Sequence, residues 1–143
     1  MQPSSDEDTA RLGEARRRLL LDAFQAAVAG VRARRPDAAF AAEESNGWIL
    51  RASAPGRLVS LSVCEDKYAG AKSEYVTLAM SSSPLPARYM GRGASKRQIV
   101  VPFVPGSASL SEVGERRLAE AAAWFSANLA GEEAPRPSRR RAA

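Results

Sequence analysis

The strongest constraint on the fold is a change in the spacing of apolar residues along the chain. Near the N-terminus they recur at intervals of three and four residues, which indicates a helix with one buried face. They are Leu12, Ala15, Leu19, Leu20, Ala23, Phe24, Ala27, Val28 and Val31. The same spacing returns near the C-terminus in Leu110, Gly114, Leu118, Ala121, Ala122, Phe125 and Leu129. Between these stretches apolar and polar residues alternate, which is typical of strands with one buried face.

The first stretch predicts a helix over residues 9–34. Asp8 or Thr9 can cap it, because short polar side chains accept hydrogen bonds from the unpaired amides of a first turn. Acidic residues before the helix also suit the positive end of its dipole. Pro36 must end it, because proline lacks an amide donor and disfavours helical geometry in the residue before it.

Ser109 and Glu112 have the spacing of a capping box. In this motif the hydroxyl accepts from the third helical amide, while the carboxylate reaches back to the amide of the capping residue. We therefore expect the second helix to begin at Ser109. Gly131 follows the last periodic residue and is a natural stop, because glycine adopts the left-handed conformation at low cost.

The alternating pattern predicts five strands in the middle of the chain, the first of them short and weak. They are expected at 39–44, 48–53, 58–64, 74–80 and 98–104. Asn46-Gly47 is a strong hairpin signal and Pro55-Gly56 fits a type II turn, so the first three strands should be antiparallel neighbours. Pro102 cannot donate to a ladder, which favours an edge position for the last strand.

Two amphipathic helices and one meander bury their apolar surfaces by packing together. The predicted fold class is therefore α+β. It is a two-layer sandwich in which an N-terminal and a C-terminal helix cover one face of an antiparallel meander of four to five strands. We expect a single domain at 9–131, after a flexible acidic N-terminus at 1–8. A disordered basic tail should follow at 132–143, where prolines and four arginines stand without apolar periodicity.

The residue types most used in catalysis and metal binding are scarce. The chain has no histidine, which is the commonest general base and metal ligand. Cys64 is its single cysteine, so an intrachain disulfide and a cysteine-based zinc site are excluded. We expect no enzyme activity, no cofactor and no metal. A catalytic alternative would require the acids, or Lys67, Tyr68 and Tyr89, to converge in one pocket.

The face of the sheet that the helices leave uncovered is the first candidate for function. Its strands would present Ile49, Leu58, Tyr75 and Ala79 among Ser and Thr residues. Such a face is apolar enough to meet a protein partner, and a second copy of the chain is the simplest partner. The sequence therefore favours a non-enzymatic interaction module that self-associates, as a homodimer, through this face.

The basic residues support an alternative function, the binding of nucleic acid or another polyanion. The candidate residues for anion or partner binding are Arg16, Arg17, Arg88, Arg92, Lys96 and Arg97. The first two are expected to face solvent from the helix, and the basic tail would add charge. Because aromatic residues are not interleaved with these bases, such binding would be driven by phosphates, sensitive to salt and unselective for sequence.

Residues 81–97 are expected to form the most mobile internal loop. This interval contains two prolines, two glycines and four basic residues. Its few large apolar side chains do not offset an ordering entropy of about 1–2 kcal/mol per residue. Glycines beside basic residues let backbone amides approach an anion, although the spacing of a P-loop is absent. Any ligand is therefore expected to act here, and an anionic partner that bridges Arg88, Arg92, Lys96 and Arg97 would order the loop.

The sequence also bears on where the protein works. No apolar run approaches the ~20 residues of a bilayer-spanning helix, and residues 1–9 hold three acids and no base, unlike a secretory signal. We expect a cytoplasmic protein with no membrane partner, in agreement with its single cysteine. Of its 21 basic residues 18 are arginines, which together with abundant alanine is typical of a GC-rich bacterial coding sequence.

Overall fold

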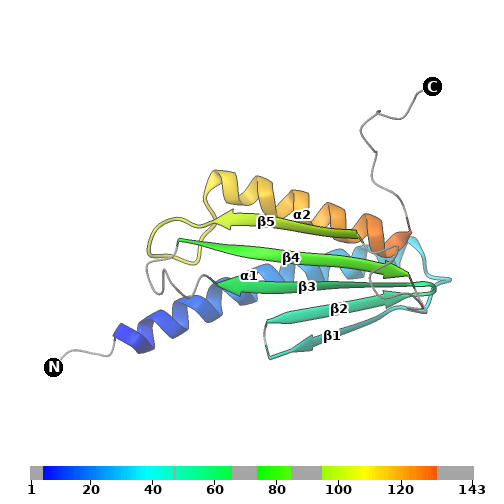
Figure 1. The fold of residues 1–143 in the computed structure, drawn as a ribbon, viewed down its shortest axis with the longest axis horizontal. Coiled ribbons are helices and arrows are strands. Elements are labelled where there is room, and N and C mark those ends of the chain that lie inside the picture. Colours follow the sequence, from blue (N-terminus) through cyan, green and yellow to red (C-terminus); the bar gives the residue numbers. More distant parts are fainter. Residues whose placement is uncertain (1–4, 47, 66–73, 85–94, 132–143) are drawn as a thin grey trace, which may run out of the picture.

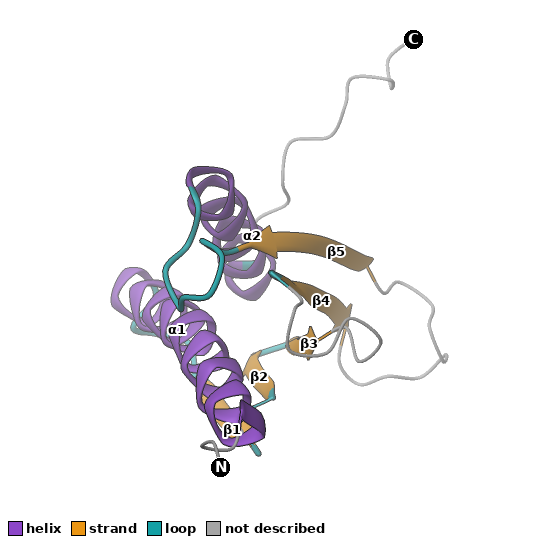
Figure 2. Cartoon of the chain, turned by 90° about the vertical axis from the view of Figure 1, so that its left-hand side faces the viewer, coloured by secondary structure: helices purple, strands orange, loops and turns teal. Residues whose placement is uncertain are grey.

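The computed structural model describes residues 5–46, 48–65, 74–84 and 95–131. Along them the chain forms α1 (Ser5–Arg34), β1 (Ala41–Ser45), β2 (Ile49–Ala54), β3 (Arg57–Glu65), β4 (Tyr75–Pro84), β5 (Ser95–Pro102) and α2 (Glu112–Ala130). The strands form one antiparallel sheet in the order β1-β2-β3-β4-β5. Both helices lie on the same face of this sheet (Figure 1 and Figure 2). The predicted α+β fold is confirmed, with five strands in the meander.

The core lies between the helices and the inner face of the sheet. Its largest fully buried side chains are Leu20, Leu21, Phe24, Leu50, Leu61, Leu78, Phe125 and Leu129. Phe24 of α1 and Phe125 of α2 meet edge to face, with ring centroids 5.2 Å apart. This geometry pairs the positive edge of one ring with the negative face of the other. The contact joins the two helices above the sheet.

Helix α1 begins at Ser5, so the predicted start at Thr9 is wrong. Residues 6–8 are acidic and occupy the first turn instead of preceding it. Carboxylates are favoured there by the positive end of the helix dipole, which explains the longer helix. The predicted end at Arg34 is confirmed, and the amide of Arg35 still donates to the carbonyl of Val31 at 2.8 Å.

The two predicted tight turns are present. Asn46 has φ 57°, and the amide of Trp48 donates to the carbonyl of Ser45 at 3.1 Å, which closes the β1–β2 hairpin. Gly56 has φ 83° between β2 and β3, as the third position of a type II turn requires. The last strand, β5, lies at an edge of the sheet, as Pro102 predicts.

Strand β4 continues past its predicted end at Met80 to Pro84, while β5 begins at Ser95 instead of Gln98 and ends at Pro102 instead of Val104. Ser81 pairs with Lys96 and Ser82 with Ser95, so both ends of the predicted loop at 81–97 belong to the sheet. Cross-strand hydrogen bonds satisfy these serines. The hydroxyl oxygens of Ser81 and Ser60 lie 3.0 Å apart, and the hydroxyl oxygen of the buried Ser82 accepts from Arg57 of β3. Such pairs stabilise a polar ladder. The remainder of that loop, at 85–94, lies outside the described residues.

Helix α2 is capped by Ser111, so the predicted cap at Ser109 is wrong. The Ser111 hydroxyl oxygen accepts from the amide of Gly114 at 3.0 Å, and the hydroxyl donates to the carbonyl of Pro102 at 3.1 Å. A Cβ on Gly114 would lie 2.1 Å from that same carbonyl oxygen. The start of α2 is therefore fixed by close contact with the end of β5, which a local capping pattern does not encode.

Candidate functional site

The sheet face opposite the helices is not covered by any described part of the chain (Figure 2). We call it the open face. The strand residues that point to it alternate with the core residues and are Ala41, Glu43, Ser45, Ile49, Arg51, Ser53, Leu58, Ser60, Ser62, Cys64, Tyr75, Thr77, Ala79, Ser81, Ser83, Lys96, Gln98, Val100 and Pro102. Most of these side chains are small or polar. The face therefore allows another backbone to approach closely.

Five residues in register form a row that crosses all five strands. Glu43 pairs with Arg51, Arg51 with Ser60, Ser60 with Ser81, and Ser81 with Lys96. We call this set the cross-strand row. It places a carboxylate at the β1 end, an ammonium at the β5 end, a guanidinium on β2 and two hydroxyls in the middle. The row is therefore polar along its length, with opposite charges at its two ends.

The middle of the open face is hollowed. A depression of about 290 Å³ is lined by Ile49, Arg51, Ser60, Leu61, Ser62, Ala79, Met80, Ser81 and Lys96. Arg51 and Lys96 are exposed, whereas Ser60 and Ser81 are half-buried between them. Within the described part of the chain, no carboxylate forms an ion pair with either of these two basic residues. Both side chains are therefore available to bind a charged group of another molecule.

Apolar side chains surround this polar centre. Tyr75 and Val100 are 38% and 39% exposed, and both point to the open face from β4 and β5. Ile49, Leu58 and Ala79 are half-buried on the same face, where the alternation predicts them. Sequence reasoning missed Arg51 as a site residue, although its position between Ile49 and Ser53 already places it on this face.

Arg16 was predicted to face solvent, and this prediction is wrong because the residue is only 4% exposed. Its Nε donates to the carbonyl of Ser107 at 2.7 Å and its Nη2 donates to Oε1 of Glu74 at 3.0 Å. Its guanidinium lies 4.6 Å from the ring centroid of Phe103. The missed signal is spacing, since Arg16 stands four residues before Leu20 on the buried stripe of α1.

The same contacts affect the titration of Glu74. The hydrogen bond from Arg16, followed by one from the Gly106 amide at 3.2 Å, lowers the pKa of this carboxyl below its usual value. Both donors favour the charged form. Glu74 and Arg16 therefore hold the segment between β5 and α2 against α1. Their role is to fix the fold, and Arg16 is not placed to bind an external anion.

The other basic residues proposed for anion binding are dispersed. The Arg17 guanidinium lies 3.7 Å from the ring centroid of Trp48, and Arg97 pairs with Glu120 of α2. Lys96 alone among the proposed residues that the structure describes points to the open face. Arg88 and Arg92 lie outside the described residues, as do Lys67, Tyr68 and Tyr89. The described residues of the proposed anion site therefore do not converge.

The described residues contain no group of three or more His, Cys, Asp or Glu side chains that could hold a metal ion. Cys64 is exposed at the end of β3. No helix in the described part of the chain is long and apolar enough to span a membrane. Comparison of the chain with protein-family models, with curated proteins and with solved structures gave no match.

Proposed function

We propose that this protein is a non-enzymatic interaction module that packs its open face against the open face of a second copy. The observation that carries the proposal is the cross-strand row, which has Glu43 at the β1 end and Lys96 at the β5 end. A surface with opposite charges at its two ends can complement itself in a two-fold dimer, because each residue then meets a different residue of the partner.

The symmetry of such a dimer follows from the order of the strands. A two-fold axis parallel to the strands and above β3 lays β1 of one copy over β5 of the other. Glu43 then faces Lys96 of the second copy twice, and Ser60 lies near the axis. The small side chains of the centre suit the ~10 Å spacing at which two sheets pack face to face.

The size of the open face supports the same proposal. The five strands hold 38 residues, and at a rise of about 3.3 Å per residue and a strand spacing of about 4.8 Å they span about 600 Å² before side-chain relief is counted. Stable interfaces bury about 800 Å² on each partner. A purely acidic partner would use Arg51 and Lys96 but oppose Glu43, so a second copy fits the charges better.

Light scattering coupled to size exclusion tests the proposal. The parent protein should increase in mass from the 15.3 kDa monomer towards twice that value over about 5–500 µM. Glu43→Lys and Lys96→Glu should each weaken association by about tenfold or more, because each places like charges together across the interface twice. The double variant should associate like the parent, since the exchange restores both pairs.

Ala79→Arg provides a second test at the centre of the face. The long cationic side chain should hold the two sheets apart and leave a monomer. Ala119→Arg, at an exposed position of α2, is the matched control and should associate like the parent. A parent protein of 15.3 kDa at every concentration contradicts the proposal. So does a double charge variant that associates no better than the single variants.

A further inference from the structure

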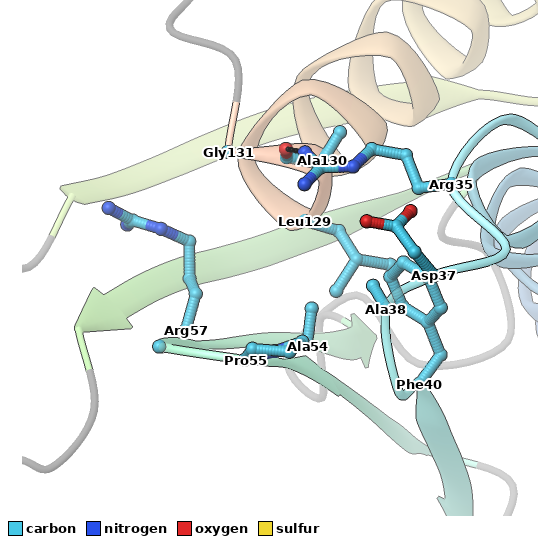
Figure 3. Close-up of a pocket in the computed structure, with 11 residues that line it drawn as sticks. Arg35, Asp37, Ala38, Phe40, Ala54, Pro55, Arg57, Leu129, Ala130 and Gly131 are labelled. Carbon is cyan, nitrogen blue, oxygen red and sulfur yellow. Dashed lines mark hydrogen bonds between the residues drawn. The ribbon is translucent and has the colours of Figure 1, made fainter.

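A second cavity lies at the end of the sandwich, away from the open face. It has a volume of about 470 Å³ and is lined by Arg35, Asp37, Ala38, Phe40, Ala54, Pro55, Gly56, Arg57, Leu129, Ala130 and Gly131 (Figure 3). Three distant segments form it: the chain after α1, the turn between β2 and β3, and the end of α2. Its volume lies within the range of ~300–1,000 Å³ that is usual for small-molecule sites.

The floor of this end pocket is apolar. Leu129 is only 2% exposed and belongs to the core, and Phe40 and Ala54 are half-buried and pack against that core. In Figure 3 the Leu129 side chain lies between Arg57 on one side and Phe40 on the other. A ligand that reaches this floor must therefore present an apolar group to it, because polar groups buried there would lose their hydrogen bonds to water.

Two of the residues that line the pocket are arginines. Arg35 donates from Nη1 to the carbonyl of Ala130 at 2.5 Å, and Arg57 donates from Nη1 to Oγ of the buried Ser82 at 2.8 Å. These bonds orient both groups, and each uses one of the five N–H donors of a guanidinium. In the described part of the chain neither arginine pairs with a carboxylate. Both retain donors for a ligand.

The two arginines differ in their surroundings. Asp37 lies beside Arg35, whereas Arg57 stands on the opposite side of the pocket with no acidic lining residue next to it (Figure 3). Arg57 is therefore the better partner for an anion. A planar carboxylate matches the fork of a guanidinium with two parallel hydrogen bonds. The C-terminal ends of α1 and α2 also meet here, and their negative dipole charge opposes a dianion such as a phosphate monoester more strongly than it opposes a single carboxylate.

We propose that the end pocket binds a small monocarboxylate with a short apolar body. The carboxylate pairs with Arg57, and the apolar body covers Leu129, Phe40 and Ala54. The same chemistry is present in a free organic acid and in the C-terminal residue of a peptide. The site is separate from the dimer surface, since Ala54 and Arg57 point to the helix side of the sheet and not to the open face.

The first test is titration calorimetry on the full chain with 3-phenylpropanoate as the probe. The neutral amide of 3-phenylpropanoate lacks the charge, and the acetate ion lacks the apolar body. Each should therefore bind about tenfold more weakly than 3-phenylpropanoate or not at all. Acetyl-Gly-Gly-Phe with a free carboxylate tests the peptide source: tighter binding than 3-phenylpropanoate assigns the ligand to peptide C-termini, and weaker binding assigns it to free acids.

Variants of the pocket complete the test. Arg57→Gln should weaken binding of 3-phenylpropanoate by about tenfold or more, whereas Arg116→Gln, at an exposed position of α2, should leave it unchanged. Ala54→Phe fills the pocket without changing charge and should abolish binding. Thermal melting checks that each variant is folded. Equal binding of the acid and its amide, or binding that survives both pocket variants, overturns the proposal. Neither result depends on whether the protein is a monomer or a dimer.

Discussion

At the scale of residues, the three consecutive arginines of α1 occupy three different environments. Arg16 is buried against Phe103, Arg17 stacks on Trp48, and Arg18 reaches Glu44 of β1 with hydrogen bonds of 2.8 and 3.1 Å. Successive helix residues are separated by about 100° of rotation, so a run of like residues cannot share one surface. A basic cluster in the sequence therefore does not predict a basic patch on the molecule.

Removing Arg16 should cost far more stability than removing Arg18. We expect Arg16→Met to lower the free energy of unfolding by about 2–4 kcal/mol, because it removes the hydrogen bonds of a buried guanidinium to Ser107 and Glu74 and its contact with the Phe103 ring. Arg18→Met removes a half-exposed side chain from the same helix and should cause a much smaller loss. Urea unfolding of the two variants makes the comparison. Equal losses would show that Arg16 is accessible to solvent.

The Arg16–Glu74 pair should make stability depend on pH. Because the pKa of Glu74 lies below its ordinary value of 4.5 in the folded protein, the unfolded chain binds more protons near that pH. The contribution of the pair is complete above the ordinary value and is lost as the pH falls through the lowered pKa. Glu74→Gln should therefore reduce the loss of stability on acidification. Urea midpoints measured from neutral to acidic pH test this, and parallel curves for parent and variant contradict it.

At the scale of elements, the sequence predicts what local signals determine. The end of α1, the Asn46 hairpin and the edge position of β5 all follow from the backbone preferences of one or two residues. The cap of α2 does not, because Ser111 is selected over Ser109 by a hydrogen bond to the carbonyl of Pro102. The ends of β4 and β5 also depend on partners in other strands. Contacts between distant segments therefore account for the errors in predicted boundaries.

Gly114 shows how one such contact determines the place of a helix. Gly114→Ala raises helix propensity but sets a methyl group 2.1 Å from the carbonyl oxygen of Pro102, so we expect a net destabilisation of about 1–3 kcal/mol. Gly30→Ala is the matched control, because nothing lies within 4 Å of its Cβ position in α1. It should stabilise the protein by about 0.5–1 kcal/mol. Thermal melts that change in the same direction for both variants contradict this account.

At the scale of the whole molecule, the two candidate sites lie on surfaces that no single segment contains. The open face exists because both helices pack on one side of the meander. The end pocket exists because the C-terminal ends of α1 and α2 lie at the same end of the sandwich (Figure 1). The sequence predicts the first arrangement from the order of its elements. It does not predict the second, because Arg35, Arg57 and Leu129 are brought together only by the packing of the helices.

If the open faces associate as proposed, thermal stability should depend on protein concentration. Unfolding of a dimer separates two chains, so each tenfold increase in concentration should raise the Tm by about 2–3 °C for a protein of this length. Ala79→Arg should remove this dependence, while Ala119→Arg should keep it. Added salt should reduce the slope, because it screens the exposed ends of the cross-strand row. Scanning calorimetry over a hundredfold range of concentration measures this dependence. A parent protein whose Tm is the same throughout that range does not unfold from a dimer, which contradicts the proposal.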